Sequence, residues 1–343
     1  MSNPAYLAAV EACKKFVDAP TRTIARHLCE NRPKLFPTLE KARTCIRRIR
    51  GNNGNKSRKE STTKSMFREN GKAGAVTIPK SDAKEWNPLV LEGARRVGVL
   101  SDIHVPYHDK RAVETAIKEC KRHRCDTIIL NGDTLDFHGV SRFERDPEAR
   151  SPAEEVRMTV KLMRYIQQQI PNARLIWKNG NHEDRWQKYI WENAPVIWQL
   201  QQCRLDGLLG YEYAEQTESD CVKLSAHGWE YVTDKLPILC GLLPILHGHE
   251  LTAGSPVNPA RGLYLRTSHT SLIGHHHATS QHTQADMFGR EVATWSTGCL
   301  CDMRPLYMPF NKWNHGFAIC DVSQDGSFDL RNLRISDGKI RAS

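Results

Sequence analysis

Three absences limit what this sequence can encode. No apolar run approaches the roughly 18 residues that a membrane-spanning helix needs, so we expect no membrane span. The first residues, Met1-Ser2-Asn3-Pro4, lack the basic segment and apolar core of a secretory signal. The 11 cysteines form no C-x-x-C pair, and Cys299-Leu300-Cys301 holds the only two that are close in sequence. We therefore expect reduced thiols in a cytoplasmic protein.

Acidic residues are scarce in the first quarter of the chain. Residues 1–84 contain 19 Lys and Arg but 7 Asp and Glu, a net charge of +12, whereas residues 85–343 contain 30 and 32, a net charge of −2. The excess that gives the whole chain its charge of +10 therefore lies at the N-terminal end. This asymmetry predicts a polyanion-binding arm joined to a near-neutral catalytic body.

The apolar pattern of residues 1–51 predicts three short helices, over 3–17, 21–30 and 38–50. Thr21 and Thr38 are the expected N-caps of the second and third helices, and Gly51 occupies the C′ position of the third. The apolar positions of the three helices are Leu7, Val10, Val17, Ile24, Ala25, Leu28, Leu39, Ala42, Ile46 and Ile49. We expect a small all-α domain.

Arg43, Arg47 and Arg50 form a basic stripe on the third helix, spaced i, i+4, i+7. The three helices are similar to a helix-turn-helix module with a basic recognition helix, which predicts DNA binding through these arginines. The second turn, about seven residues, is longer than the usual three or four. The alternative is a three-helix bundle with a solvated basic face. Residues 52–94 are expected to be a basic flexible linker that can touch phosphates without sequence preference.

Residues 95–343 repeat one pattern: a short apolar run and then residues able to bind a metal. In open α/β sheets, ligands collect at the carboxyl ends of strands. The five motifs are Asp102-Ile103-His104, Asn131-Gly132-Asp133, Gly180-Asn181-His182-Glu183, His247-Gly248-His249 and Gly274-His275-His276-His277. Helices are predicted over 110–122, 152–169 and 184–210, strands of a second sheet within 221–246, and closing antiparallel strands over 291–296, 316–322 and 328–335.

This order of motifs, D-x-H, GD-x-x-D, GNH-E, H-G-H and GH-x-H, resembles the calcineurin-like metallophosphoesterase family over roughly residues 95–335. The resemblance implies an α/β fold in which two mixed sheets form a sandwich flanked by helices. It also implies a two-metal hydrolase in which a metal-bridging hydroxide attacks a phosphate ester. Residues 258–262 and 311–316 look like those of phage and prophage metallophosphoesterases described as DNA repair exonuclease-like. A phage-encoded protein would work in the host cytoplasm.

The family's functional residues carry over onto the motif positions. The resemblance implies that Asp133 bridges two divalent metals. The remaining ligands would be Asp102, His104 and His277 for the first metal, and Asn181, His247 and His275 for the second. Oxygen and imidazole ligands without thiolates suit Mn, which we expect, or Fe, Zn or Ni. His182 would face the substrate as an acid–base group, and Asp136 would support catalysis by orienting a ligand.

The residues after Asp136 bear on the substrate, and two alternatives to the predicted function stay open. Asp136 is followed by Phe137-His138-Gly139, not by the Arg-Gly of protein Ser/Thr phosphatases, so a basic phosphate clamp is missing at that place. We therefore predict a phosphodiesterase or nuclease that acts on DNA. The alternatives are a phosphomonoesterase acting on a nucleotide or a phosphoprotein, and a DNA-binding regulatory protein whose metal site is incidental.

Overall fold

The computed structural model describes residues 3–51, 78–83, 85–143, 147–148, 150–210, 222–224, 228–232, 235–251 and 257–342. The chain divides into two compact units, Met1–Ala83 and Lys84–Ser343. No helix within the described ranges is long and apolar enough to cross a membrane. Most of the predicted linker, 52–77, lies outside the described residues.

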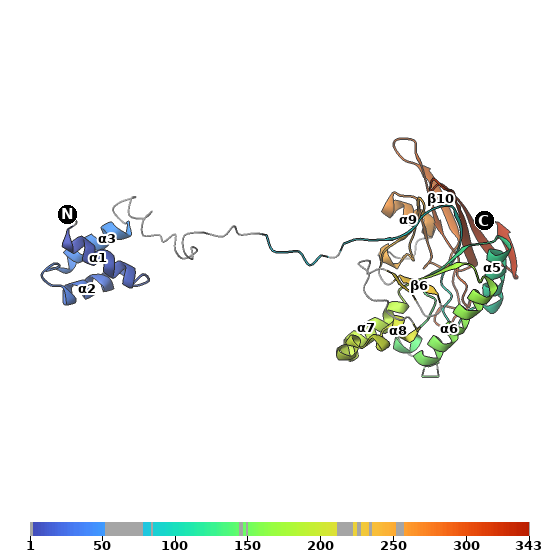
Figure 1. Ribbon diagram of the computed structural model, residues 1–343, viewed down its shortest axis with the longest axis horizontal. Coiled ribbons are helices and arrows are strands. Elements are labelled where there is room, and N and C mark those ends of the chain that lie inside the picture. The colour runs from blue at the N-terminus through green and yellow to red at the C-terminus, as the bar shows by residue number, and fades with distance from the viewer. Residues whose placement is uncertain are drawn as a thin grey trace. The chain divides into compact units, whose positions relative to one another are not determined.

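The first unit contains the three helices expected from the sequence: α1 (Pro4–Lys15), α2 (Thr21–Asn31) and α3 (Leu39–Arg50) (Figure 1). The Thr38 side chain accepts the Lys41 N–H, and Gly51 closes α3 with φ +87°, a left-handed cap that glycine adopts without strain. Thr21 is not a cap, because α2 begins at that residue after Pro20. Ala8, Ala9 and Ala12 form the buried face of α1, while Leu7 and Val17 are exposed.

Arg50, predicted to bind DNA, is engaged within the first unit. Its guanidinium donates hydrogen bonds to the carbonyl oxygens of Ala19 (2.6 Å), Phe16 (2.9 Å) and Val17 (3.0 Å). These carbonyls follow the end of α1, where a cation also complements the helix dipole. Arg50 therefore ties α3 to the C-terminal end of α1, and its contact with DNA stays a prediction.

The second unit is built from two sheets. The eight-stranded sheet has the order β14-β13-β12-β2-β3-β4-β6-β5, and the six-stranded sheet has the order β1-β7-β8-β9-β11-β10. The strands of the first are β2 (Arg95–Leu100), β3 (Thr127–Asn131), β4 (Arg174–Lys178), β5 (Val222–Leu224), β6 (Trp229–Val232), β12 (His315–Val322), β13 (Phe328–Ser336) and β14 (Lys339–Ala342). Those of the second are β1 (Leu89–Leu91), β7 (Ile238–Cys240), β8 (Leu243–Ile245), β9 (Ser271–Ile273), β10 (Ser280–Ala285) and β11 (Glu291–Ser296).

Alternation along the central strands produces two separate cores. Val97, Val99 and Ile129 pack against buried residues of the six-stranded sheet and form the interior of the sandwich. Their neighbours Leu100 and Ile128 face the other way, into a core shared with α5 (Lys110–Arg122) and α6 (Pro152–Gln169) (Figure 1). The strands are apolar on both faces because both are covered, as expected for parallel strands inside an α/β sandwich. α9 (Pro259–Thr267) packs on β10 and β11.

Several predicted elements are placed differently by the structure. β1 pairs with β7, so the second unit begins before the predicted domain boundary at residue 95. β5 and β6 join the eight-stranded sheet, whereas they were expected in a second sheet. The helix predicted over 184–210 is broken after α7 (Glu183–Asn193), because Pro195 cannot continue the helical hydrogen bonds. Short turns follow: η2 (Pro195–Gln199), η3 (Gln201–Cys203) and α8 (Leu205–Leu208). Two further turns are η1 (His138–Val140) and η4 (His249–Leu251).

Candidate metal centre

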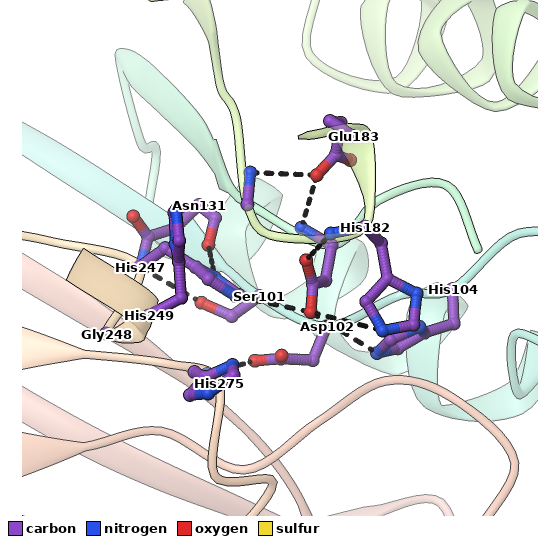
Figure 2. A network of polar contacts seen from close by, with 12 residues as sticks. Ser101, Asp102, His104, Asn131, His182, Glu183, His247, Gly248, His249 and His275 are labelled. Atoms are coloured by element: carbon purple, nitrogen blue, oxygen red, sulfur yellow. Dashed lines mark hydrogen bonds and ion pairs between the residues drawn. The ribbon is translucent and has the colours of Figure 1, made fainter. Parts of the chain in front are cut away.

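Five loops bring the predicted ligands together, three from one sheet and two from the other. β2, β3 and β4 are parallel neighbours, so the loops that follow them emerge at one edge of the eight-stranded sheet. β8 and β9 are parallel in the six-stranded sheet, and their loops carry the histidines of the last two motifs. In Figure 2 the labelled histidines gather in two groups, His104 with His182 and His247 with His275, with Asp102 between them.

Most of the predicted ligands adopt a left-handed backbone conformation. The φ angles are +55° at Asp102, +51° at His104, +50° at Asp133, +65° at His275 and +56° at His277. A side chain in this region costs on the order of 1–3 kcal/mol and persists only where the surroundings enforce it. Such strain clusters at functional sites. Its concentration on five predicted ligands marks this edge of the sandwich as a functional centre.

The glycines of two motifs are needed for close approach. A Cβ on Gly180 would overlap the carboxylate and the backbone nitrogen of Asp133, and one on Gly132 would overlap the His247 ring. Gly132 also has φ +82°. Only glycine therefore lets the loops after β3, β4 and β8 lie against one another.

Asp133 lies centrally among the histidines. Its Oδ2 is 3.2 Å from His247 Nε2, 3.8 Å from His182 Nε2 and 4.0 Å from His104 Nε2. Its Oδ1 accepts the His182 N–H at 2.9 Å. Burial alone would raise the pKa of Asp133, but the surrounding histidines, His247 foremost, hold that pKa well below its ordinary value. A central, ionised carboxylate is the group that two adjacent cations need to share.

The residues assigned to the first metal are in mutual contact. His104 Nε2 lies 3.2 Å from His277 Nε2, and His277 Nε2 lies 3.2 Å from Asp102 Oδ1. The other oxygen of Asp102, Oδ2, accepts the His275 N–H at 2.9 Å. Asp102 thereby contacts the motif after β9 with both of its carboxylate oxygens.

The residues assigned to the second metal gather on the other side of Asp133. Ligand-capable atoms of Asp133, His247 and His275 lie within 4.8 Å of one another. The His247 Nδ1 lies 2.8 Å from the Asn131 carbonyl oxygen, which directs its Nε2 towards Asp133. This partner of the second ring nitrogen is typical of a metal-ligating histidine.

The donor atoms fit divalent cations. Within the described part of the chain, Asn181 Oδ1 and His275 Nδ1 are buried without a hydrogen-bond partner. Asp102 Oδ1 and His247 Nε2 are buried with only an ion-pair neighbour at 3.2 Å. Buried polar atoms are otherwise almost always satisfied, so convergent orphans are explained by a ligand that bonds to them. Two divalent cations held by the seven predicted residues would supply Lewis acidity towards phosphate oxygens.

His182 and Asp136, the predicted catalytic residues, are linked at the rim of this cluster. His182 Nδ1 lies 2.9 Å from the Asp136 carbonyl oxygen and 3.1 Å from its Oδ1. The same Oδ1 lies 3.1 Å from His104 Nδ1, so Asp136 orients both rings. Burial lowers the pKa of His182, but Asp133 and Asp136 outweigh it and raise that pKa above its ordinary value. A histidine with a raised pKa can act as the acid that donates a proton to a leaving oxygen.

Arg185, which was not among the predicted site residues, reaches the same rim from α7. Its Nη1 donates to the Asp136 carbonyl at 2.7 Å, and its Nη2 lies 2.8 Å from His182 Nε2. A guanidinium is thus present beside the centre although the residues directly after Asp136 are Phe137 and His138 and not an arginine. Its position two residues after Glu183, the last residue of the GNH-E motif, was the available signal.

Glu183 organises the loop that carries Asp133. Its side chain accepts the N–H groups of Asp133 (2.9 Å), Thr134 (2.8 Å), Leu135 (3.2 Å) and Gly180 (2.8 Å). Burial, with the negative charge of Asp133 adding to it, raises the pKa of Glu183 to about 7. The motif contained Glu183, but only the fold reveals that it holds backbone.

Glu250 has a matching role at the loop after β8. It accepts the N–H groups of His247 (3.2 Å) and Gly248 (2.6 Å) and pairs at 2.9 Å with Lys178, whose side chain is fully buried. Burial would raise the pKa of Glu250, but the neighbouring charges, Lys178 foremost, outweigh burial and lower that pKa to about 2. A buried ion pair of this kind fixes the turn that presents His247.

Cys301 is a further residue near the first metal's ligands. Its Sγ lies 3.8 Å from His277 Nδ1, and it forms a possible metal-binding group with His104 and His277. His276 is absent from the possible metal-binding groups of the described residues, as is His249, whose two ring nitrogens are buried. The predicted DNA-binding residues Arg43, Arg47 and Arg50 belong to the first unit.

Comparisons with solved structures found several similar chains. Vacuolar protein sorting 29 from Cryptosporidium parvum is 12% identical, with a TM-score of 0.38, over 74% of this chain and 97% of that one. Zinc-complexed Vps29 from Entamoeba histolytica is 13% identical, with a TM-score of 0.37, over 72% and 97%. A dimetal phosphatase from Danio rerio is 12% identical, with a TM-score of 0.34, over 73% and 97%. No match was found among curated proteins.

The family assignment comes from the sequence of the second unit. Residues 95–294 match the profile of the family described as Calcineurin-like phosphoesterase. The match covers more than half of the 343 residues and contains all five motifs. The chain therefore belongs to the calcineurin-like phosphoesterase family and is a metal-dependent hydrolase of phosphate esters.

Proposed function

We propose that this protein is a two-metal phosphodiesterase that cleaves DNA and that its N-terminal unit holds the DNA. The observation that supports this is the separation of charge: +12 in residues 1–84 and −2 in the residues that contain the metal centre. Phosphate contacts by Lys and Arg dominate non-specific DNA affinity. A basic unit joined to a phosphoesterase suits a substrate that is itself a polyanion. Mn is the metal that we propose.

The proposed DNA contacts lie on α3. Arg43 and Arg47 are half-buried, and Lys41, Thr44 and Arg48 form its exposed face. Arg43 pairs with Glu40 across one turn. Arg50 supports this unit through its contacts with the end of α1. We propose that Arg43 and Arg47, with the exposed Arg48, contact phosphates in the manner of a helix-turn-helix module.

Phosphomonoester hydrolysis is the second candidate, and Arg185 is the observation that favours it. A monoester carries more charge on its phosphoryl group than a diester, and a guanidinium binds such a group through paired hydrogen bonds. The absence of arginine after Asp136 argued against monoesters, but Arg185 supplies the missing cation from another element. Substrate preference therefore has to be measured directly.

A substrate panel in Mn²⁺ separates these functions. It compares p-nitrophenyl phosphate, methyl p-nitrophenyl phosphate, and single- and double-stranded DNA, with Asp133→Asn as the inactive control. The proposed function predicts cleavage of the diester and of DNA at higher kcat/KM than of the monoester. Preference for the monoester with intact DNA would establish the second candidate in its place.

A deletion tests the DNA-binding arm. Removal of residues 1–84 takes away a net charge of +12 but leaves every ligand motif and β1. Hydrolysis of methyl p-nitrophenyl phosphate should persist, while DNA affinity should fall and lose its dependence on salt. For the full chain, log K should decrease with log[salt] by about 0.9 per phosphate contact on duplex DNA. If the deletion leaves the DNA affinity and its salt slope unchanged, the N-terminal unit is not a DNA-binding arm.

A pair of double variants locates the contacts. Arg43→Ala with Arg47→Ala should reduce the salt slope, whereas Lys14→Ala with Lys15→Ala removes the same charge from the last turn of α1 and serves as the control. Equal effects from both pairs would indicate that net charge alone, without a docking face on α3, attracts DNA.

A further inference from the structure

The loop between β11 and β12 exposes large apolar side chains beside the metal centre. Leu306 and Phe310 are each 96% exposed, Tyr307 is 67% exposed and Met308 is 44% exposed. They follow one another within the segment Arg304-Pro305-Leu306-Tyr307-Met308-Pro309-Phe310. Scattered exposed apolar residues need no explanation, but a contiguous exposed group marks a binding surface.

A chain of aromatic rings connects this loop to the predicted metal ligands. The Trp313 ring lies 4.2 Å from the His277 ring, centroid to centroid, and the Tyr307 ring lies 6.4 Å from that of Trp313. Burial raises the pKa of the Tyr307 hydroxyl, and the negative charge of Asp136 adds to this effect. Through Trp313, the Tyr307 ring is thus the second ring outward from His277, and Tyr307 is 67% exposed.

Hydrogen bonds hold the loop in one shape. The Asn311 side-chain amide donates to the carbonyls of Met303 (2.8 Å) and Met308 (2.9 Å), and its oxygen accepts the Trp313 N–H (3.0 Å). The Asp302 N–H donates to the Tyr107 carbonyl at 2.7 Å, which anchors the start of the loop. Pro305 and Pro309 restrict it further by fixing two φ angles. A preordered loop loses little entropy when it binds a ligand.

The charge of the loop indicates the ligand. Within residues 302–313, Arg304 and Lys312 are exposed cations and Asp302 is an exposed anion, so the net charge is +1. Arg185 adds a further cation beside the centre itself. Aromatic faces combined with flanking cations are the pattern that binds single-stranded nucleic acid, in which bases stack on rings and phosphates meet Lys or Arg. Paired bases of a duplex are already stacked on their neighbours and cannot reach such a surface.

We propose that residues 302–313 form a stacking platform for the unpaired bases next to the scissile phosphate, so that the substrate is single-stranded DNA or a single-stranded end. This rests on the proposed phosphodiesterase function. Tyr307 and Phe310 stack the bases, and Arg304 and Lys312 contact the adjoining phosphates. Trp313 positions the platform against the His277 ring.

The test compares kcat/KM on single-stranded DNA with kcat/KM on methyl p-nitrophenyl phosphate. Tyr307→Ala and Phe310→Ala should each lower this ratio by roughly 5- to 150-fold, which corresponds to the ~1–3 kcal/mol of one stacked base. Tyr307→Phe keeps the ring and should restore the ratio. Phe288→Ala is the matched control, because Phe288 is also an exposed aromatic residue (75% exposed) and lies in the turn between β10 and β11, outside the proposed surface.

Binding gives a readout that does not depend on cleavage. A single strand containing 2-aminopurine, mixed with the full-length protein in EDTA, should lose fluorescence when its base stacks, and Phe310→Ala should abolish that loss. If the wild type cleaves only the small diester yet still quenches the strand, the nuclease function fails and the platform stands.

Three results would overturn the platform. The first is absence of quenching by the wild type. The second is an equal loss on both substrates in Tyr307→Ala and Phe310→Ala, which would mean that the centre itself is distorted. The third is a concentration-dependent dimer that Phe310→Ala abolishes, because a second copy of the chain would then occupy the loop.

Discussion

Replacing Glu183 by glutamine should destabilise the second unit although the two side chains have the same shape. One oxygen of Glu183 accepts the N–H groups of Thr134 and Leu135, and the other accepts those of Asp133 and Gly180. At a pH above about 7, where the Glu183 carboxyl is ionised, both oxygens therefore act only as acceptors. In Glu183→Gln one of them becomes an NH₂ group, a donor that faces two further donors.

The size of the effect follows from the backbone groups that lose their partner. Two buried N–H groups become unsatisfied whichever way the amide is turned, at about 1–3 kcal/mol each. The expected loss is roughly 2–6 kcal/mol, a large part of the ~5–15 kcal/mol that stabilises a typical domain. Because Asp133 lies in the displaced loop, metal affinity should fall as well.

Urea unfolding followed by tryptophan fluorescence measures this loss. All 8 tryptophans lie between Trp86 and Trp313, so the signal reports on the second unit of the full-length chain. Glu192→Gln, an exposed change on the same helix, is the control and should have no effect. A decrease in the free energy of unfolding below about 1 kcal/mol, with unchanged metal content, would refute this prediction. It would mean that one Glu183 oxygen already carries a proton in the wild type, so that the NH₂ group of glutamine replaces an existing donor.

Three other perturbations have defined outcomes. Asp133→Asn should abolish turnover and lower the bound metal measured by elemental analysis, because a neutral amide cannot bridge two cations; full metal content with a wild-type rate would contradict this. His182→Ala should retain the metals but slow cleavage by roughly 10²–10⁴-fold, most for poor leaving groups; loss of metal would instead make His182 a ligand. Burial is the main cause that raises the pKa of Glu155 from 4.5 to about 8. The contribution of the protonated side chain to stability is therefore present below pH 4.5 and is lost as the pH rises through 8, where the buried carboxyl group loses its proton. Glu155→Gln, which keeps the acceptor for the Phe137 N–H, should therefore unfold at higher urea than the wild type at pH 9, and equal midpoints would contradict this.

The elements with strong local signals were predictable from sequence. α6 spans Pro152–Gln169 as predicted, because Ser151 and Glu154 form a capping box and Pro152 occupies the first turn. The two-sheet sandwich flanked by helices is confirmed, and its central strands β2 and β3 bury apolar side chains on both faces. The partners of β5 and β6 were not predictable, because short strands carry no information about which sheet will accept them.

The site was predictable to the extent that side chains meet the metals directly. The motifs identify residues by type and spacing, and the fold brings these residues together. Glu183 and Glu250 act on backbone N–H groups, which are identical at every position and leave no trace in the sequence. Arg185 lies two residues after Glu183, but its contacts with Asp136 and His182 follow only from the fold, as does the contact of Trp313 with the His277 ring. The glycine at position 180 was visible, but its reason, contact with Asp133, was not.

The left-handed ligands have a consequence for how this sequence can change over time. Asp102, His104, Asp133, His275 and His277 occupy backbone conformations that glycine or asparagine would adopt at less cost. While catalysis is under selection, the side chains are retained against that preference. A lineage that lost the activity would be free to relax, and each replacement by glycine would remove strain from the fold. Related sequences that carry glycine or asparagine at several of these five positions together should therefore be inactive proteins that are more stable than this one.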